Sequence, residues 1–298
     1  FTFDIASQAG SSGTLNIGRF GTNDTGGTII APTITFGAGT GAINFNQSDA
    51  VTITSSISGA GTLHQLGGGA TTLSASNNYT GATTVSAGQL VVDGSIAGST
   101  VTVNNGGTLA GSGSVGGLIV ASGGTISPGN SPGNLTVEGT LQWNGGGNYN
   151  WQVLGTTNTS GYVAGTTWDL ITVTGALDLT ALTPSSKFNL NLWSLSSTAP
   201  DTNGPITNFN STTSYEWLAV SANTITGFNA AHFAVNVGAT NGTGGFSNPL
   251  DGGYLFGVRQ DGGNLYVTYG QAAPIPEPGT WAAMAIFAGG AAYAGWRR

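Results

Sequence analysis

The sequence predicts an all-β solenoid, followed by a β-rich cap and ending in one short apolar helix. Three observations support this prediction. Short runs of Val, Ile, Leu and Thr recur with glycine between them, a Gly-x-Leu element returns at short intervals, and tryptophan first appears at Trp143. We therefore divide the chain into a solenoid at residues 1–145, a β-rich cap or sandwich at 146–270 and a terminal segment at 271–298.

Residues 1–145 are expected to form the coils of the solenoid. In its β-type runs an apolar residue alternates with threonine, so one face of each strand points inward and the other outward. The clearest runs are at 51–54, 71–73, 89–92, 100–103, 118–120 and 134–137.

The repeated element has a short and imperfect period. Its apolar positions, 19, 17 and 15 residues apart in order, are Leu90, Leu109, Ile126 and Leu141. Such repetition is typical of a solenoid, in which each coil buries its apolar face against its neighbours. Glycine suits the corners because it adopts positive φ without strain. An antiparallel sandwich is the alternative, but the close spacing of the turns favours the solenoid.

Residues 146–270 contain longer alternating runs, for example at 188–192 and 233–237, and longer polar loops, for example at 238–253. All seven tryptophans fall at or after the junction, and five of them, from Trp143 to Trp217, precede the terminal segment. We expect a β-rich cap or sandwich here, because such a unit would cover the open edge of the last coil.

The terminal segment contains a stretch of membrane character. Residues 281–296 carry no charge, and sixteen residues span about 24 Å as an α-helix, a little less than the apolar core of a bilayer. Arg297 and Arg298 follow directly and favour the cytoplasmic side. We expect a membrane helix, with a buried core helix as the alternative. The residues assigned to the membrane segment are Trp281, Ile286, Phe287 and Trp296.

Composition excludes several classes of function. The chain has five basic and twelve acidic residues and a formal net charge of −7, whereas binding a nucleic-acid backbone needs several basic groups. Nucleic acid is therefore not an expected partner. Cysteine is absent, which excludes disulfides, thiolate metal sites and cysteine nucleophiles and is typical of an exported protein.

The first zone contains segments that share the spacing of one known repeat: GAGTL at 59–63, LSASNNYTGATTV at 73–85 and AGQL at 87–90. Together they resemble the autotransporter-associated β-strand repeat. Its usual continuation follows as NGGTLAGSG at 105–113 and GGTISPGNSPG at 123–133, so the resemblance covers about residues 55–142. The resemblance implies a right-handed parallel β-helix and no particular chemistry.

A Pro-Glu-Pro motif at Pro276, Glu277 and Pro278 precedes the apolar segment and the basic end. This order resembles the PEP-CTERM sorting signal. The resemblance implies recognition by an exosortase-type processing enzyme in the inner membrane of a Gram-negative bacterium, where the chain is anchored transiently. Cleavage near the motif would then release or transfer the body to the cell surface or biofilm matrix.

Two motifs that are associated with catalysis lack the context they need. Gly-x-Gly-x-x-Gly at 111–116 is followed by a strand-type run rather than the helix that holds a dinucleotide. Gly-x-Ser-x-Gly at 129–133 has Pro132 after the serine, and proline lacks the N–H that an oxyanion hole uses. The two histidines, His64 and His232, have no ligand or carboxylate at local spacing. We predict no catalytic residue, no metal site and no cofactor.

The leading hypothesis is a non-enzymatic structural protein, a stiff stalk carried to the cell surface. One alternative is a self-assembling filament or surface-layer subunit, because the flat ends of solenoids can stack without closing into a ring and so form a homo-oligomer. The other is a carbohydrate-binding adhesin with exopolysaccharide as a partner, because the tryptophans of residues 146–270 can stack on sugars. The competing explanation is that these tryptophans fill the core of the cap.

Overall fold

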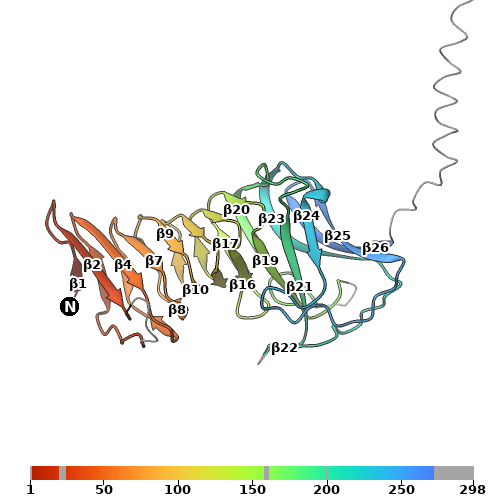
Figure 1. The fold of residues 1–298 in the computed structure, drawn as a ribbon, viewed down its shortest axis with the longest axis horizontal. Helices are drawn as coiled ribbons and strands as arrows, with labels where there is room; N and C mark the ends of the chain where they lie inside the picture. Colours follow the sequence, from red (N-terminus) through yellow and green to blue (C-terminus); the bar gives the residue numbers. More distant parts are fainter. Residues whose placement is uncertain (1, 20–24, 158–160, 199–200, 272–298) are drawn as a thin grey trace, which may run out of the picture.

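A computed structural model describes residues 2–19, 25–157, 161–198 and 201–271. In these residues the chain forms an elongated stack of β-coils, with the N-terminal coils at one end and the widest coils at the other (Figure 1). Helix in the described residues is limited to one 3-10 turn, η1 (Ala230–His232). The all-β prediction is confirmed. No described helix has the length and hydropathy that a membrane span requires, and the helix predicted at 281–296 lies outside the described residues.

Two long sheets extend along the stack and a third, short sheet lies at its N-terminal end; the strands pair in parallel except at the C-terminal end. The three-stranded sheet contains β1 (Thr2–Ile5), β3 (Thr33–Phe36) and β6 (Ser56–Ser58). The nine-stranded sheet contains β5 (Val51–Ile53), β8 (Ala70–Leu73), β10 (Gly88–Val92), β13 (Gly107–Gly111), β16 (Thr125–Pro128), β19 (Asn148–Val153), β21 (Phe188–Thr198), β22 (Asp201–Asn203) and β24 (Phe233–Asn236). The fourteen-stranded sheet contains β2 (Ser12–Ile17), β4 (Thr40–Phe45), β7 (Thr62–Gln65), β9 (Thr83–Val85), β11 (Ser95–Ile96), β12 (Val101–Val103), β14 (Ser114–Val115), β15 (Leu118–Val120), β17 (Asn134–Val137), β18 (Leu141–Trp143), β20 (Leu170–Asp178), β23 (Tyr215–Thr226), β25 (Tyr254–Asp261) and β26 (Asn264–Gln271).

The register follows the repeated element for three of its four copies. Leu90 pairs with Leu109 and Leu109 with Ile126, and all three side chains are fully buried. The fourth copy does not continue this row, because Leu141 pairs with Leu118 on another sheet and Tyr149 takes the place above Ile126. The cause is a longer turn at 129–133, which adds residues to this coil between β16 and β17.

Glycine is required where neighbouring coils come closest. Gly111 has a φ of +101°, and a Cβ there would overlap the carbonyl oxygen of Val92 on the preceding coil. Gly59, with a φ of +94°, faces the carbonyl oxygen of Phe36 in the same way. At these corners a side chain would be both strained and obstructed.

One apolar core fills the stack from end to end. Towards the N-terminus its members are mostly Val, Ile and Leu, and towards the C-terminus large aromatic rings replace them. Trp143 stacks on Phe188 with ring centroids 4.1 Å apart, and Trp151 meets the edge of Trp217 at 5.9 Å. The aromatic rings fill the larger cross-section of the coils that contain β20, β21 and β23.

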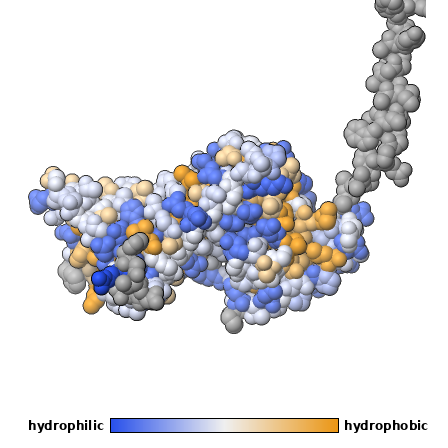
Figure 2. Space-filling view, in the orientation of Figure 1, coloured by the Kyte–Doolittle hydropathy of each residue, from blue (hydrophilic) through white to orange (hydrophobic). Residues whose placement is uncertain are grey.

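Parallel pairing continues well past residue 146, through β19, β21 and β24 on one sheet and β20 and β23 on another. The chain then reverses, and the hairpin of β25 and β26 pairs antiparallel with β23. Beneath the hairpin, Phe256 packs against Phe246 and Tyr269 with centroids 4.9 Å apart in both pairs. Figure 2 shows apolar surface over these last strands, where Leu255 is 61% exposed.

Candidate functional site

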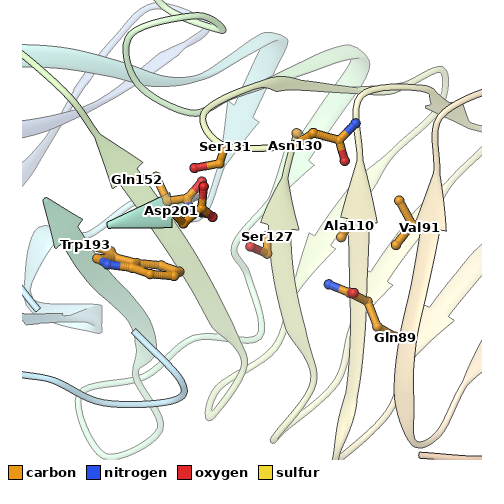
Figure 3. A pocket seen from close by; sticks show the side chains of 10 residues that line it. Gln89, Val91, Ala110, Ser127, Asn130, Ser131, Gln152, Trp193 and Asp201 are labelled. Atoms are coloured by element: carbon orange, nitrogen blue, oxygen red, sulfur yellow. Dashed lines mark hydrogen bonds between the residues drawn. The ribbon is translucent and has the colours of Figure 1, made fainter. Parts of the chain in front are cut away.

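A shallow groove of about 320 Å³ lies on the outer face of the nine-stranded sheet. It crosses the strands from β10 to β21 and therefore follows the long axis of the solenoid (Figures 1 and 3). We call this feature the lateral groove. Its lining residues are Gln89, Val91, Ala110, Ser127, Gly129, Asn130, Ser131, Gln152, Trp193 and Asp201.

The floor of the lateral groove is a row of small side chains on successive coils. Val91 pairs with Ala110, and Ala110 with Ser127. Each of these three residues directly follows a buried residue of the repeated element. Because successive side chains of a strand point to opposite faces, the three point outward. Because these side chains are short, the surface is hollow between the larger groups at either end (Figure 3).

A tryptophan closes the C-terminal end of the lateral groove. Trp193 on β21 lies in register with Gln152 on β19 and is half-buried. The Gln152 Nε2 donates a hydrogen bond to the Asp201 carboxylate at 3.2 Å. Asp201 is the first residue of β22, which folds back antiparallel on β21. An aromatic ring, an amide and a carboxylate thus gather at one point of an otherwise flat face (Figure 3).

The buried carboxylate of Asp169 holds in place the turn at 129–133, which forms one side of the lateral groove. Asp169 accepts hydrogen bonds from the backbone N–H of Gly133 at 2.8 Å and from that of Gln152 at 2.9 Å. Burial raises the pKa of Asp169 well above its ordinary value, against the two N–H donors, which lower it. The side chain thereby ties the turn at 129–133, which carries Asn130 and Ser131, to strand β19.

The lateral groove does not assemble a catalytic constellation from the described residues. Ser131 lies in a turn with a φ of +77° rather than at the start of a helix, and neither histidine lines the groove. His64 on β7 has its two ring nitrogens bonded to the hydroxyls of Thr84 and Thr62. His232 ends the 3-10 turn η1 and directly precedes strand β24.

Groups of three potential metal-ligating side chains are likewise absent from the described ranges. The prediction that the chain has no catalytic residue or cofactor stays a prediction.

Most of the tryptophans in the described residues belong to the core. Trp143, Trp151 and Trp217 are fully buried, and Trp168 is 5% exposed. Only Trp193, among the five, lies at the groove. The number of tryptophans from Trp143 to Trp217 was therefore a poor guide to a binding surface, because core filling accounts for four of the five.

The residues predicted to act in sorting and membrane insertion lie outside the described residues. They are Pro276, Glu277, Pro278, Trp281, Ile286, Phe287, Trp296, Arg297 and Arg298. Their roles stay predictions.

Comparison with known proteins identifies a repeat in the N-terminal half of the chain. Residues 63–92 match the passenger-associated-transport-repeat family, which confirms the prediction of autotransporter-type repeats in this segment. The chain is 52% identical over 107 residues, 35% of its length, to the adhesin BmaC autotransporter of Brucella suis biovar 1. It is 42% identical over 97 residues, 33% of its length, to an extracellular serine protease of Serratia marcescens. These stretches cover only 3% and 9% of the two relatives.

Proposed function

We propose that this chain is a non-enzymatic passenger displayed on the surface of a Gram-negative bacterium. The observation that carries the proposal is a passenger-associated-transport repeat built into one continuous stack of parallel coils. Such a stack is stiff because each coil pairs with the next along its strands. The similarity to a stretch of an autotransporter adhesin supports the same reading.

The route to the surface is part of this proposal. Pro276, Glu277 and Pro278 would be recognised by an exosortase-type enzyme while residues 281–296 hold the chain transiently in the inner membrane. Arg297 and Arg298 would keep the C-terminus on the cytoplasmic side. The body would then be released to the surface or to the extracellular matrix.

Mass spectrometry of the C-terminal peptide tests the route. We expect protein from the extracellular fraction to end near Pro276 to Pro278, and protein from the membrane fraction to include some that still ends at Arg298. Removing Arg297 and Arg298 should lower the processed fraction, whereas a Gln142→Ala variant should leave it unchanged. Extracellular protein that ends at Arg298 would contradict processing, and it would favour an assembly or anchoring role for residues 281–296.

Adhesion is a second candidate, and the lateral groove is the observation that favours it. The groove is an open surface feature without a catalytic group, as a binding surface requires. A strain that lacks the protein should adhere less to its natural substratum than the parent strain. Equal adherence of the two strains would set this candidate aside without affecting the proposal of surface display.

A further inference from the structure

We propose that the lateral groove binds a neutral polysaccharide whose chain lies along the axis of the solenoid. This inference rests on the proposed surface function for its biological use, and it names the ligand class of the candidate site. It is carried by the side chains that line the groove, by their spacing and by the row of hydroxyls that extends it.

The charge of the groove selects against most other ligands. None of the groove-lining residues in the described part of the chain is basic, and Asp201 contributes one negative charge. Phosphorylated or sulfated ligands would meet a carboxylate and no counter-charge. Ala110 and Val91 are the only aliphatic lining residues, so a lipid chain would bury little apolar area. A neutral ligand rich in hydroxyl groups remains.

The polar groups suit sugar hydroxyls in both type and number. The Gln89 and Asn130 amides each offer a donor and an acceptor, and Gln152 with Asp201 forms a bonded pair that can accept further hydrogen bonds. Trp193 lies beside this pair, and an aromatic ring provides the apolar surface on which the C–H face of a sugar ring packs. Trp193, Gln152 and Asp201 therefore lie together at the β21 end, and the Gln89 amide lies at the β10 end (Figure 3).

The groove is shaped for a chain rather than for a single sugar. Five strands from β10 to β21 cross it, and four inter-strand steps span about 19 Å. Towards the N-terminus the floor continues in register from Val91 to Thr72 and from Thr72 to Thr52, whose side chains face outward. This row adds a hydroxyl group on each further coil, so the ligand does not have to end at Gln89.

The experiment measures binding of neutral hexasaccharides to the purified full-length chain. The probes are β-glucan, mannan, galactan and N-acetylglucosamine oligomers, with dextran sulfate as the anionic comparison, followed by calorimetry and tryptophan fluorescence. We expect at least one neutral probe to bind and dextran sulfate not to bind. Trp193→Ala should weaken binding about tenfold, as expected for loss of an aromatic contact.

A second variant keeps the test independent of folding. Ser127→Phe fills the floor from an outward position and should abolish binding while leaving the circular dichroism spectrum and melting temperature unchanged. Gln89→Ala should weaken binding about threefold, which is a small hydrogen-bond effect. Its matched control is Gln142→Ala, another half-buried outward glutamine, which lies on β18 of a different sheet.

The outcomes separate the groove from the proposed function. Absence of binding by every neutral probe, or equal binding by folded Ser127→Phe protein, would overturn the glycan site and leave surface display standing. Binding with the expected variant pattern would support the site even if the C-terminal processing were shown to differ.

Discussion

The thin coils at residues 79–137 and the wide coils from residue 141 to β24 are stacked by parallel pairing but are filled differently. Strands β9 to β17 contain two to five residues and surround Val, Leu and Ile. Strands β20, β21 and β23 contain 9, 11 and 12 residues and surround tryptophan and phenylalanine. The strand length sets the cross-section, and the core residues change in volume to fill it.

The two regions also satisfy their buried polar groups differently. In the thin coils the hydroxyl of Tyr79 bonds that of Thr83 at 2.7 Å, and Thr83 bonds Ser99 at 2.8 Å. In the wide coils an asparagine ladder runs across the sheet. Its side-chain bonds are 2.8–3.0 Å long and join Asn150, Asn191, Asn236 and Asn241. The lateral groove lies at the junction, where the small outward residues of the thin coils meet β21 and β22.

The largest effect is expected from Trp143→Ala in the wide coils. It removes the ring that stacks on Phe188 at 4.1 Å and leaves a cavity in a fully buried site. We expect the free energy of unfolding to fall by about 4 kcal/mol, measured by urea titration with circular dichroism. The neighbouring Gln142→Ala variant is the control: it loses one half-buried hydrogen bond, to Asn144, and should change the free energy of unfolding by no more than about 1 kcal/mol.

Leu109→Ala makes the corresponding cavity in the thin coils. Leu109 is fully buried between Leu90 and Ile126, and its truncation should cost about 3 kcal/mol in the same titration. Hydrogen exchange should show the loss of protection confined to adjacent coils, because each coil contacts mainly its neighbours. A loss spread evenly to β25 and β26 would contradict the separation of the two regions.

Asp169→Asn tests the buried polar group at the junction. The Asp169 carboxylate accepts hydrogen bonds from two backbone N–H groups, and the asparagine NH2 would face one of these donors. We therefore expect the free energy of unfolding to fall by about 2 kcal/mol. Because burial raises the pKa of Asp169, its contribution to stability is full below the ordinary pKa of aspartate and falls as the pH rises through the raised value. Stability of the parent chain should decline over that window, and an identical slope in the variant would assign it to another group.

Tyr79→Phe should have the smallest effect, about 1 kcal/mol, because one hydrogen bond is lost while Thr83 keeps its bond to Ser99. Burial raises the pKa of Tyr79 to about 12, so the parent chain should lose stability between pH 10 and pH 12, where only the unfolded state releases the proton. The variant should lack this decline when unfolding is followed in alkaline buffers. A larger loss than that of Asp169→Asn would show that the thin coils depend more strongly on their polar groups.

Sequence periodicity was sufficient to predict the inner face of the thin coils. Leu90, Leu109 and Ile126 stack as their spacing indicated. Leu141 departs from that row because the glycine-flanked turn at 129–133 lengthens one coil, and an apolar pattern does not report how many residues a turn absorbs. Tyr149 takes its place above Ile126, and Gly147-Asn148-Tyr149 repeats the glycine spacing of the element with an aromatic residue where Leu or Ile was expected.

The lateral groove was not predicted from the sequence. Gln89, Ser127, Gln152 and Trp193 come from four different strands, and their proximity depends on the coil register rather than on any local motif. Trp193 resembles Trp143, Trp151 and Trp217 of the core because each of the four lies in a β-strand. A signal does exist once the register is known. Asn150 and Asn191 of the ladder face outward, and the next outward position on the same two strands holds Gln152 and Trp193 instead of asparagine.

The direction of the inter-coil hydrogen bonds determines how the molecule responds to force. The strands stack along the long axis (Figure 1), so a pull on the two ends loads the coils in series and every coil bears the full tension. The thin coil of β10, β11 and β12 is joined to that of β13, β14 and β15 through nine residue pairs, whereas β19 and β20 are joined to β21 and β23 through twelve. Under tension the thin coils should therefore unfold first. The molecule would then lengthen while the wide coils stay folded.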